Sequence, residues 1–271
     1  MSLPVPTSLS PSRVASFKDC ALAFRFSAIE HLPEPPSPWA SKGTLVHAAL
    51  EKLFADVPPE QRSVEEGLAQ LERAWAELRN TPDFADLGLD GPAEAEWLED
   101  AATLVANYFR LEDPCTVRAI GLELKLEARL GTLALRGVID RLDLDEHGGL
   151  VVTDYKTGRA PGVAYENGRL GGVQFYAFLC EQLFGRRPVR IQLLHLREPV
   201  AISAVPTEQS VRGFQGRTSA IWSAVEKACV QEDFRPRPSP LCGYCAFKTW
   251  CPSFGGDPAL ARADLLAVVA G

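Results

Sequence analysis

Two acidic residues and a lysine in neighbouring segments form the first group in this chain that could do chemistry. Asp140 ends the run Gly-Val-Ile-Asp, and Asp154 and Lys156 follow fourteen and sixteen positions later. Hard divalent cations such as Mg²⁺ prefer oxygen ligands and are often bound by one or two carboxylates together with phosphate oxygens and water. A lysine beside such an ion can reach the same phosphate or the attacking water. This group therefore predicts metal-dependent cleavage of phosphodiesters.

The residues around these side chains predict a hairpin that would position them. The β-branched pair before Asp140 and the run Leu-Val-Val-Thr over residues 150–153 are typical of strands, and residues 147–149, His-Gly-Gly, are typical of a turn. Both acids would then lie near one rim of a sheet, and Lys156 would point to the same face as Asp154. The alternative is a solvated Asp–Lys pair on a strand surface, which contributes little to stability.

A second candidate site is built from cysteines. Cys242, Cys245 and Cys251 form the pattern C-x2-C-x5-C, and Cys20, more than two hundred residues upstream, can supply a fourth thiolate if the two ends of the chain meet. Four thiolates suit a [4Fe–4S] cluster or a tetrahedral zinc ion. Disulfides are the alternative. Three further cysteines lie in or near apolar segments and are expected to pack as small buried hydrophobes: Cys115, Cys180 and Cys229.

Length and composition are those of an ordinary globular protein. The 271 residues, 46% of them hydrophobic and 23% charged, suffice for one elaborated domain or two small ones. Apolar runs of membrane-spanning length are not found, and residues 1–12 lack the basic start and apolar centre of a signal peptide. We therefore expect a cytoplasmic protein without a membrane partner.

Charge is distributed unevenly along the chain, whose net charge is −7. Residues 1–115 hold 9 Lys and Arg against 19 Asp and Glu, whereas residues 116–271 hold 19 against 16. The basic residues therefore concentrate in the half that carries the Asp–Lys group, where arginines are candidates for phosphate contacts; scattered arginines that keep a surface soluble are the alternative. The arginines considered are Arg129, Arg136, Arg141, Arg159, Arg169, Arg186, Arg187, Arg190, Arg212 and Arg217.

The pattern of apolar residues predicts helices first and a mixture of strands and helices afterwards. Ser10 is expected to cap a helix that runs to about residue 29, and the chain then turns at a proline-rich segment. Further helices are expected over residues 41–54, 63–79, 93–111, 170–184 and 207–231, and strands over residues 117–130, 133–144, 150–155, 188–197 and 200–205. This succession predicts an α/β core with a mixed sheet.

Taken together and in order, the motifs resemble the RecB-type exonuclease branch of the PD-(D/E)XK nuclease superfamily, particularly members closed by an iron–sulfur staple. The resemblance covers nearly the whole chain. It rests on Cys20, on Gly43-Thr44-Leu45-Val46-His47, on Gly137-Val138-Ile139-Asp140, on Asp154-Tyr155-Lys156-Thr157, on Gln174, and on Cys242-Gly243-Tyr244-Cys245 with Cys251.

The resemblance implies a particular architecture. It predicts a PD-(D/E)XK nuclease core, which is a mixed central sheet flanked by helices, within a single nuclease domain over residues 1–271. A helical insertion is expected over residues 56–115. A C-terminal Cys-cluster segment over residues 236–256 is expected to join the N-terminal helix through the four cysteines, whose occupant is then a [4Fe–4S] cluster rather than zinc, with an architectural role.

The resemblance also implies roles for individual residues. Mg²⁺ or Mn²⁺ would be bound by His47, Asp140, Asp154 and the backbone carbonyl of Tyr155. Lys156 would orient water or stabilise charge on the phosphate.

Residues next to this set have less settled roles. Gln174 would contact the active site or DNA. Relatives often carry a tyrosine four positions later, where this chain has Phe178, with Tyr176 nearby. Glu51 is expected to orient His47 or to be an exposed acid, and Glu123 to face the same centre or to point outward.

The expected activity is that of a metal-dependent DNA exonuclease that acts on single-stranded ends in repair, recombination or defence. A P-loop motif for an ATP-driven motor is not found in the sequence, so a helicase or a CRISPR-adaptation protein is a possible partner. The alternative function is a catalytically inactive nucleic-acid-binding subunit that is stabilised by its metal cluster.

Overall fold

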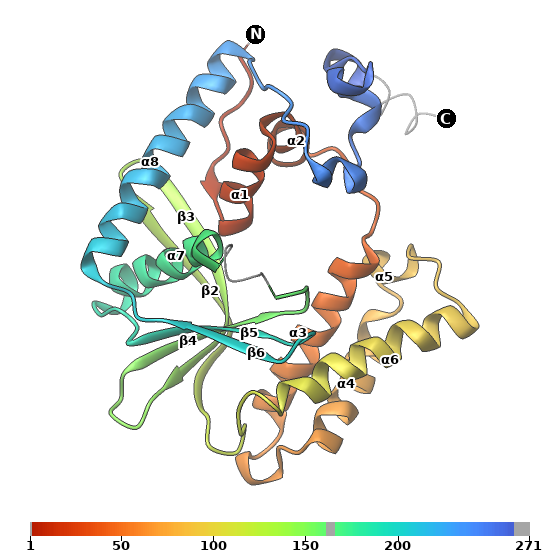
Figure 1. The fold of residues 1–271 in the computed structure, drawn as a ribbon, viewed down its shortest axis with the longest axis vertical. Helices are drawn as coiled ribbons and strands as arrows, with labels where there is room; N and C mark the ends of the chain where they lie inside the picture. Colours follow the sequence, from red (N-terminus) through yellow and green to blue (C-terminus); the bar gives the residue numbers. More distant parts are fainter. Residues whose placement is uncertain (1, 161–165, 263–271) are drawn as a thin grey trace. The chain divides into compact units, whose positions relative to one another are not determined.

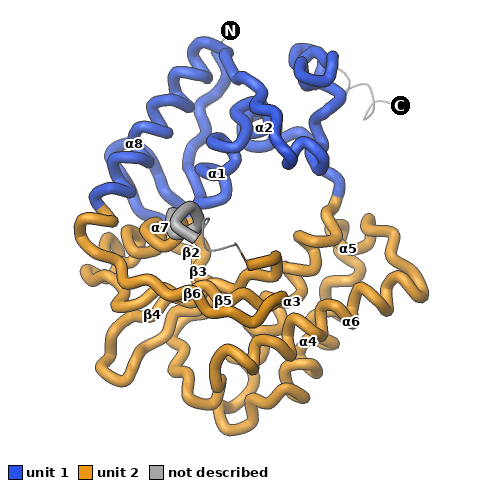
Figure 2. The backbone as a smooth tube through the Cα atoms, viewed as in Figure 1, with its two compact units in different colours: residues 1–35, 127–136, 212–271 blue, residues 36–126, 137–211 orange. Residues whose placement is uncertain are grey.

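The computed structural model describes residues 2–160 and 166–262, and the chain forms two compact units (Figure 2). Unit 1 consists of residues 1–35, 127–136 and 212–271, and unit 2 of residues 36–126 and 137–211. Each unit is therefore assembled from segments that are distant in sequence. The single nuclease domain over residues 1–271 and the helical insertion over residues 56–115 remain predictions, because the division into two units bears on neither.

The sheet is mixed, as predicted, and its strands follow the order β3-β4-β5-β6 in unit 2 (Figure 1). β3 pairs antiparallel with β4, β4 parallel with β5, and β5 antiparallel with β6. β2 also pairs with β3, and the two-residue connection between them is one that only antiparallel neighbours can use. The strands span β2 Arg118–Leu130, β3 Leu133–Leu144, β4 Leu150–Lys156, β5 Arg190–His195 and β6 Val200–Ala204.

Helices cover both faces of the unit 2 sheet. Consecutive strand residues point to opposite faces, so Asp154 and Tyr155 contact helices on different sides. On one side, Tyr155 joins a hydrophobic core formed with helices α3, α4 and α6. On the other side, Asp154 accepts a hydrogen bond from Tyr176 of helix α7. The helices span α3 Pro38–Asp56, α4 Val64–Leu78, α5 Pro82–Ala85, α6 Gly91–Tyr108 and α7 Glu166–Phe184, with the 3-10 turn η2 at Pro59–Gln61.

Local sequence explains where these helices begin. Ser37 caps α3 by accepting a hydrogen bond from the Ala40 amide, and Pro38 occupies the first helical position, which suits its fixed φ. The helix therefore starts three residues before the expected Ser41. Ser63 caps α4 in the same way by accepting from the Glu66 amide.

Unit 1 contains the first and last segments of the chain. Strand β1 (Ser8–Leu9) pairs in parallel with residues 134–135 of β3. Ser10 caps helix α1, as expected, but the single helix expected to run to about residue 29 is wrong. At Cys20 the backbone becomes extended (φ −158°, ψ 108°), which ends α1 (Pro11–Asp19) before α2 (Ala21–Phe24) and the π-helical turn η1 (Arg25–Ile29) begin.

The C-terminal segment of unit 1 folds against its N-terminal helices. After helix α8 (Glu208–Gln231, which begins in unit 2), the chain makes short 3-10 turns. The ring of Phe26 lies 5.3 Å from that of Phe247 and 6.2 Å from that of Trp250, and Arg237 donates a hydrogen bond to the Lys18 carbonyl. The expected meeting of the two ends of the chain is thus seen in these contacts. The turns are η4 Pro240–Tyr244, η5 Lys248–Trp250, η6 Pro252–Phe254 and η7 Pro258–Leu260.

Within the described ranges, helices long and apolar enough to cross a bilayer do not occur.

Candidate metal centre

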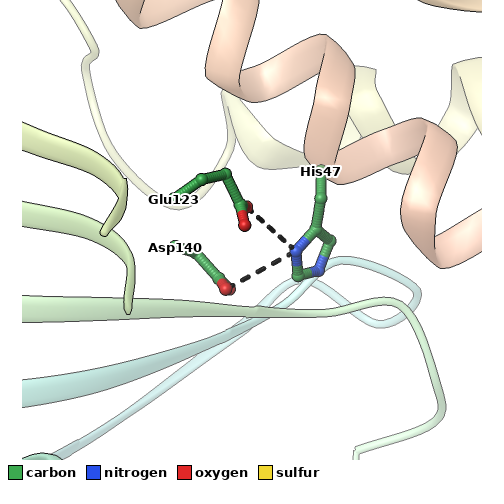
Figure 3. A group of neighbouring side chains, drawn as sticks. All are labelled: His47, Glu123 and Asp140. Carbon is green, nitrogen blue, oxygen red and sulfur yellow. Dashed lines mark ion pairs between the residues drawn. The ribbon is translucent and has the colours of Figure 1, made fainter. Parts of the chain in front are cut away.

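His47 of α3 faces two carboxylates from separate strands of unit 2 (Figure 3). Its Nδ1 atom lies 3.8 Å from Glu123 Oε1 of β2 and 3.6 Å from Asp140 Oδ1 of β3. Its Nε2 atom lies 3.1 Å from the backbone carbonyl oxygen of Tyr155. One potential ligand atom from each of His47, Glu123 and Asp140 lies within 4.8 Å of the others. An imidazole and two carboxylates therefore meet at the Nδ1 side of His47, and the Tyr155 carbonyl faces the Nε2 side of the same ring.

Helix α3 reaches this position because one of its residues lacks a side chain. A Cβ atom on Gly43 would lie 3.2 Å from the Thr157 hydroxyl oxygen, so glycine allows the helix to approach the end of β4. Gly43 and His47 are four residues apart and lie on the same face of the helix. Leu45, Val46 and Ala49 are fully buried and anchor the opposite side.

The β3–β4 hairpin places the two aspartates differently. Asp140 accepts a hydrogen bond from the Tyr155 amide at 2.7 Å, which fixes its carboxylate beside His47. Asp154 accepts from the Tyr176 hydroxyl through Oδ1 at 3.2 Å and forms an ion pair with Lys156 through Oδ2. Lys156 thus points to the face of Asp154, as predicted. Within the described chain Asp154 lies beside the three-residue group rather than in it.

Glu123 occupies a backbone conformation that is rare for a residue with a side chain. Its φ is +41°, although it lies within β2. Such conformations cost about 1–3 kcal/mol and cluster at functional sites. In the sequence Glu123 alternates with leucines and is followed by Lys125 and Glu127, which is typical of an outward-facing strand edge. The structure places its carboxylate beside His47, which is the inward direction of the two considered from the sequence.

Burial and concentrated negative charge alter the acidity of this group. Burial raises the pKa of Asp140 to about 7. The imidazole of His47 opposes this shift, and the charge of Asp154 adds to it. Burial alone would lower the pKa of His47, but its hydrogen bond to Glu123 and the charges of Asp140 and Asp154 exceed that effect and raise it. A site that gathers carboxylates and an imidazole in this way has the donors that a divalent cation requires.

The centre opens into a cavity of about 460 Å³ that Glu51 also lines. Burial and then the charge of Glu123 raise the pKa of Glu51. On α7, Gln174 is half-buried and lies two positions before Tyr176. Phe178 is buried, and the hydroxyl that donates to Asp154 belongs to Tyr176, two positions before Phe178.

One arginine considered for phosphate contacts is excluded by its surroundings. Arg141 is fully buried and pairs with Glu112 at 2.6 Å and with Asp143 at 2.8 Å. Its guanidinium also donates to the Tyr155 hydroxyl. Arg141 therefore has a structural role, and its expected phosphate contact is wrong. The side chain of Arg169 lies outside the described residues.

The four cysteines of the second site all belong to unit 1, although in the described chain no three of their sulfur atoms lie within 4.8 Å of one another. Burial raises the pKa of Cys245, and the thiols of Cys20, Cys242 and Cys251 each raise it further. Cys20 lies at the break between α1 and α2, and the Ser239 amide donates a hydrogen bond to the Cys242 sulfur. Of the other three cysteines, Cys180 and Cys229 are buried as expected; Cys115 is exposed, so its expected burial is wrong.

Comparisons with known proteins agree with this architecture. Residues 8–252 match the family model of the PD-(D/E)XK nuclease superfamily. The fold is similar to that of a presumed exonuclease from Eubacterium rectale, with a TM-score of 0.54 and 12% identity over 88% of this chain and 87% of that one. A second solved structure, SSO0001, shares 16% identity over 86% of this chain and 92% of that one, but its TM-score is only 0.35. Curated proteins gave no match.

Proposed function

The chain belongs to the PD-(D/E)XK nuclease superfamily, and within it we propose a divalent-metal-dependent exonuclease that acts on DNA ends, with single-stranded DNA as its substrate. The presumed exonuclease from Eubacterium rectale, which shares the fold, supports this proposal. We place the protein in the cytoplasm, where it would act in repair, recombination or defence, alone or beside a helicase or a CRISPR-adaptation protein.

The observation that carries the proposal is the grouping of His47, Glu123 and Asp140, with the Tyr155 carbonyl oxygen beside the other ring nitrogen of His47. These donors suit Mg²⁺ or Mn²⁺, and Asp154 is the adjacent candidate ligand. A cation bound there would polarise the phosphoryl oxygen and make its bound water more acidic.

Lys156 supplies positive charge next to this centre. Its side chain is 38% exposed, so its ammonium can contact a phosphate while it remains paired with Asp154. The Tyr176 hydroxyl holds the other oxygen of Asp154 and fixes the direction of this pair. Lys156 would thus orient the attacking water or stabilise the charge that develops on the phosphate, and Gln174 would contact the substrate from α7.

For the second site we propose a [4Fe–4S] cluster bound by Cys20, Cys242, Cys245 and Cys251, with zinc as the alternative occupant. The effect of the other three thiols on the pKa of Cys245 supports this grouping. Such a cluster would join α1 and α2 to the C-terminal segment of unit 1, which argues for an architectural role.

Cleavage of end-labelled DNA tests the proposed activity. Anaerobically purified protein should degrade single-stranded DNA in the presence of Mn²⁺ or Mg²⁺, and the label released first reports the polarity. Lys156→Ala and Asp154→Ala should abolish cleavage. Binding of DNA by the wild type without any cleavage would instead support a catalytically inactive binding subunit.

A further inference from the structure

An exposed tryptophan lies in the first turn of α3, two helical turns before His47. The side chain of Trp39 is 67% exposed. Tryptophan has the largest apolar surface of any residue and is usually mostly buried. The neighbouring Trp97 shows the usual behaviour, because it is buried and donates a hydrogen bond to the Pro38 carbonyl. The exposure of Trp39 therefore requires an explanation.

Trp39 lines several cavities of unit 2, two of which matter for a substrate. The first is the cavity of the metal centre, which it lines together with His47 and Glu123. The second is a cavity of about 500 Å³, lined by Trp39, Lys42, Arg159 and Arg197. Thr157 borders both cavities. A chain-like ligand with one group at the metal centre would pass Trp39 before it reached the three basic residues.

The second cavity carries positive charge held in a fixed geometry. Arg197 donates two hydrogen bonds to Asp100, at 3.1 and 2.7 Å, and Lys42 donates one at 2.7 Å. Two cations thus share one carboxylate, and the exposed guanidinium of Arg159 adds a third cation. The surroundings favour an anionic ligand.

The same cations hold the indole ring in place. The Lys42 ammonium lies 5.4 Å from the centroid of the Trp39 ring, and the Arg197 guanidinium carbon lies 5.9 Å from it. Both distances are within the range of cation–π attraction. The ring is therefore supported by its neighbours while most of its surface stays open.

We propose that Trp39 is a stacking platform for one unpaired nucleobase of the DNA strand whose scissile phosphate lies at the metal centre, while Arg159 and Arg197 contact the adjacent backbone phosphate and the buried Lys42 adds its charge from behind. An exposed aromatic ring beside cations is the arrangement by which proteins hold single strands without reading their sequence. A base within a duplex presents no free face to such a ring. The inference rests on the proposed nuclease function and deepens it, because it assigns the preference for single-stranded DNA to one residue.

The test compares Trp39→Ala with Trp39→Phe, which keeps an aromatic face, and with Phe184→Ala. Phe184 is a matched control because it is 41% exposed and lines neither cavity. Stacking on an aromatic side chain is worth about 1–3 kcal/mol per base, so Trp39→Ala should raise KM for single-stranded DNA about fivefold or more. Trp39→Phe should restore most of the loss, and Phe184→Ala should behave as the wild type.

Oligonucleotides that each carry one abasic site provide a second measurement. A purely structural role of Trp39 would not make KM depend on the position of the missing base. For the wild type, removal of the base at one fixed distance from the cleaved bond should raise KM by a similar factor. For Trp39→Ala, removal of that base should have no further effect, because its stacking partner is already absent. Melting temperatures of the variants establish that each is folded.

The possible failures are distinguishable. If the wild type neither cleaves nor binds DNA, the proposed function is wrong and this inference with it. If the wild type cleaves single-stranded DNA but Trp39→Ala has the same KM and the same response to abasic sites, the nuclease assignment holds and the stacking platform is overturned.

Discussion

At the scale of single residues, Glu123 and His47 meet although 76 positions separate them in the chain. Their contact at 3.8 Å depends on the left-handed backbone of Glu123 within β2. The left-handed backbone of Glu123 has an energetic cost, and it occurs where it brings a third side chain to the metal centre. Glu123 is therefore a candidate metal ligand beside Asp140.

Removal of the negative charge of Glu123 should weaken metal binding. Glu123→Gln keeps the size of the side chain but not its charge, and we expect it to raise the Mn²⁺ concentration needed for half-maximal cleavage about tenfold or more. The matched control is Glu127→Gln, which lies on the same strand but pairs with the exposed Arg136. Equal metal requirements for the two variants would contradict this role.

The pH dependence of stability tests the role of Asp100, which pairs with Lys42 and Arg197 beside the second cavity. The hydrogen bond from Arg197 lowers the pKa of Asp100 to about 2. Burial opposes this shift, and Lys42 adds to it. Because this pKa lies below the unfolded value of about 3.9, Asp100 stabilises the fold fully above about pH 4, and the effect is lost as the pH falls through 2. Asp100→Asn should thus be less stable than the wild type at pH 7.

Chemical denaturation across this pH range provides the measurement. The difference in stability between Asp100→Asn and the wild type should shrink as the pH falls from 4 to 2, whereas Asp86→Asn, at an exposed position, should show no such trend. A difference that stays constant would show that Asp100 acts through shape rather than charge.

At the scale of elements, a buried polar network joins α6 to the β3–β4 hairpin. Arg141 pairs with Glu112 beyond the end of α6 and with Asp143 of β3, and it donates to the hydroxyl groups of Tyr108 and Tyr155. Tyr155 also presents the carbonyl oxygen that faces His47. The network therefore connects the packing of the α6 helix with the position of a candidate metal ligand.

Loss of Arg141 should destabilise the protein strongly. Arg141→Met would leave the carboxylates of Glu112 and Asp143 without their cation, and breaking a buried pair costs about 3–5 kcal/mol. Arg136→Met, which breaks the exposed pair with Glu127, should cost about 0–1 kcal/mol. Urea denaturation measures both, and comparable losses would refute the role assigned to the buried network.

Two helical glycines should respond in opposite ways to substitution by alanine. A Cβ on Gly67 of α4 would lie 2.8 Å from the ring of Phe109, so Gly67→Ala should cost about 1–3 kcal/mol through overpacking. A Cβ on Gly172 of α7 would meet no atom of the described residues within 4 Å, and alanine there should add up to about 1 kcal/mol of stability. Thermal denaturation that ranks the two variants in the reverse order would contradict the packing of α4.

Features that are determined by residues close in sequence could be predicted, whereas features that depend on distant residues could not. The hairpin around Asp140 and Asp154 is specified locally by β-branched residues and a Gly-Gly turn, and it was predicted correctly. The break of the first helix at Cys20 was missed because the local sequence contains no glycine or proline there. The burial of Arg141 and the direction of Glu123 depend on partners from distant segments, so local patterns do not reveal them.

At the scale of the whole molecule, unit 1 unites the first and the last segments of the chain. The ring contacts of Phe26 with Phe247 and Trp250 and the bond from Arg237 to Lys18 bring Cys20 to the same unit as Cys242, Cys245 and Cys251. A cluster bound by all four would close a loop of more than two hundred residues. The proposed cluster would therefore contribute to the folding of unit 1.

Removal of one thiol should release this cluster. Cys20→Ser is expected to lose the iron content and visible absorbance of the anaerobically purified protein and to lower its melting temperature. Cys115→Ser, at an exposed cysteine outside the group, should retain both. Zinc in place of iron would identify the alternative occupant, and a full metal content in Cys20→Ser would exclude Cys20 as a ligand.

We propose that the group of His47, Glu123 and Asp140 holds the cation that drives DNA cleavage. The most direct measurement is a Mn²⁺ titration of the cleavage of end-labelled single-stranded DNA by the wild type and by Asp140→Asn. We predict cleavage by the wild type that saturates with Mn²⁺ and none by Asp140→Asn at any concentration. Cleavage by Asp140→Asn at the wild-type rate and with the same Mn²⁺ dependence would contradict the account.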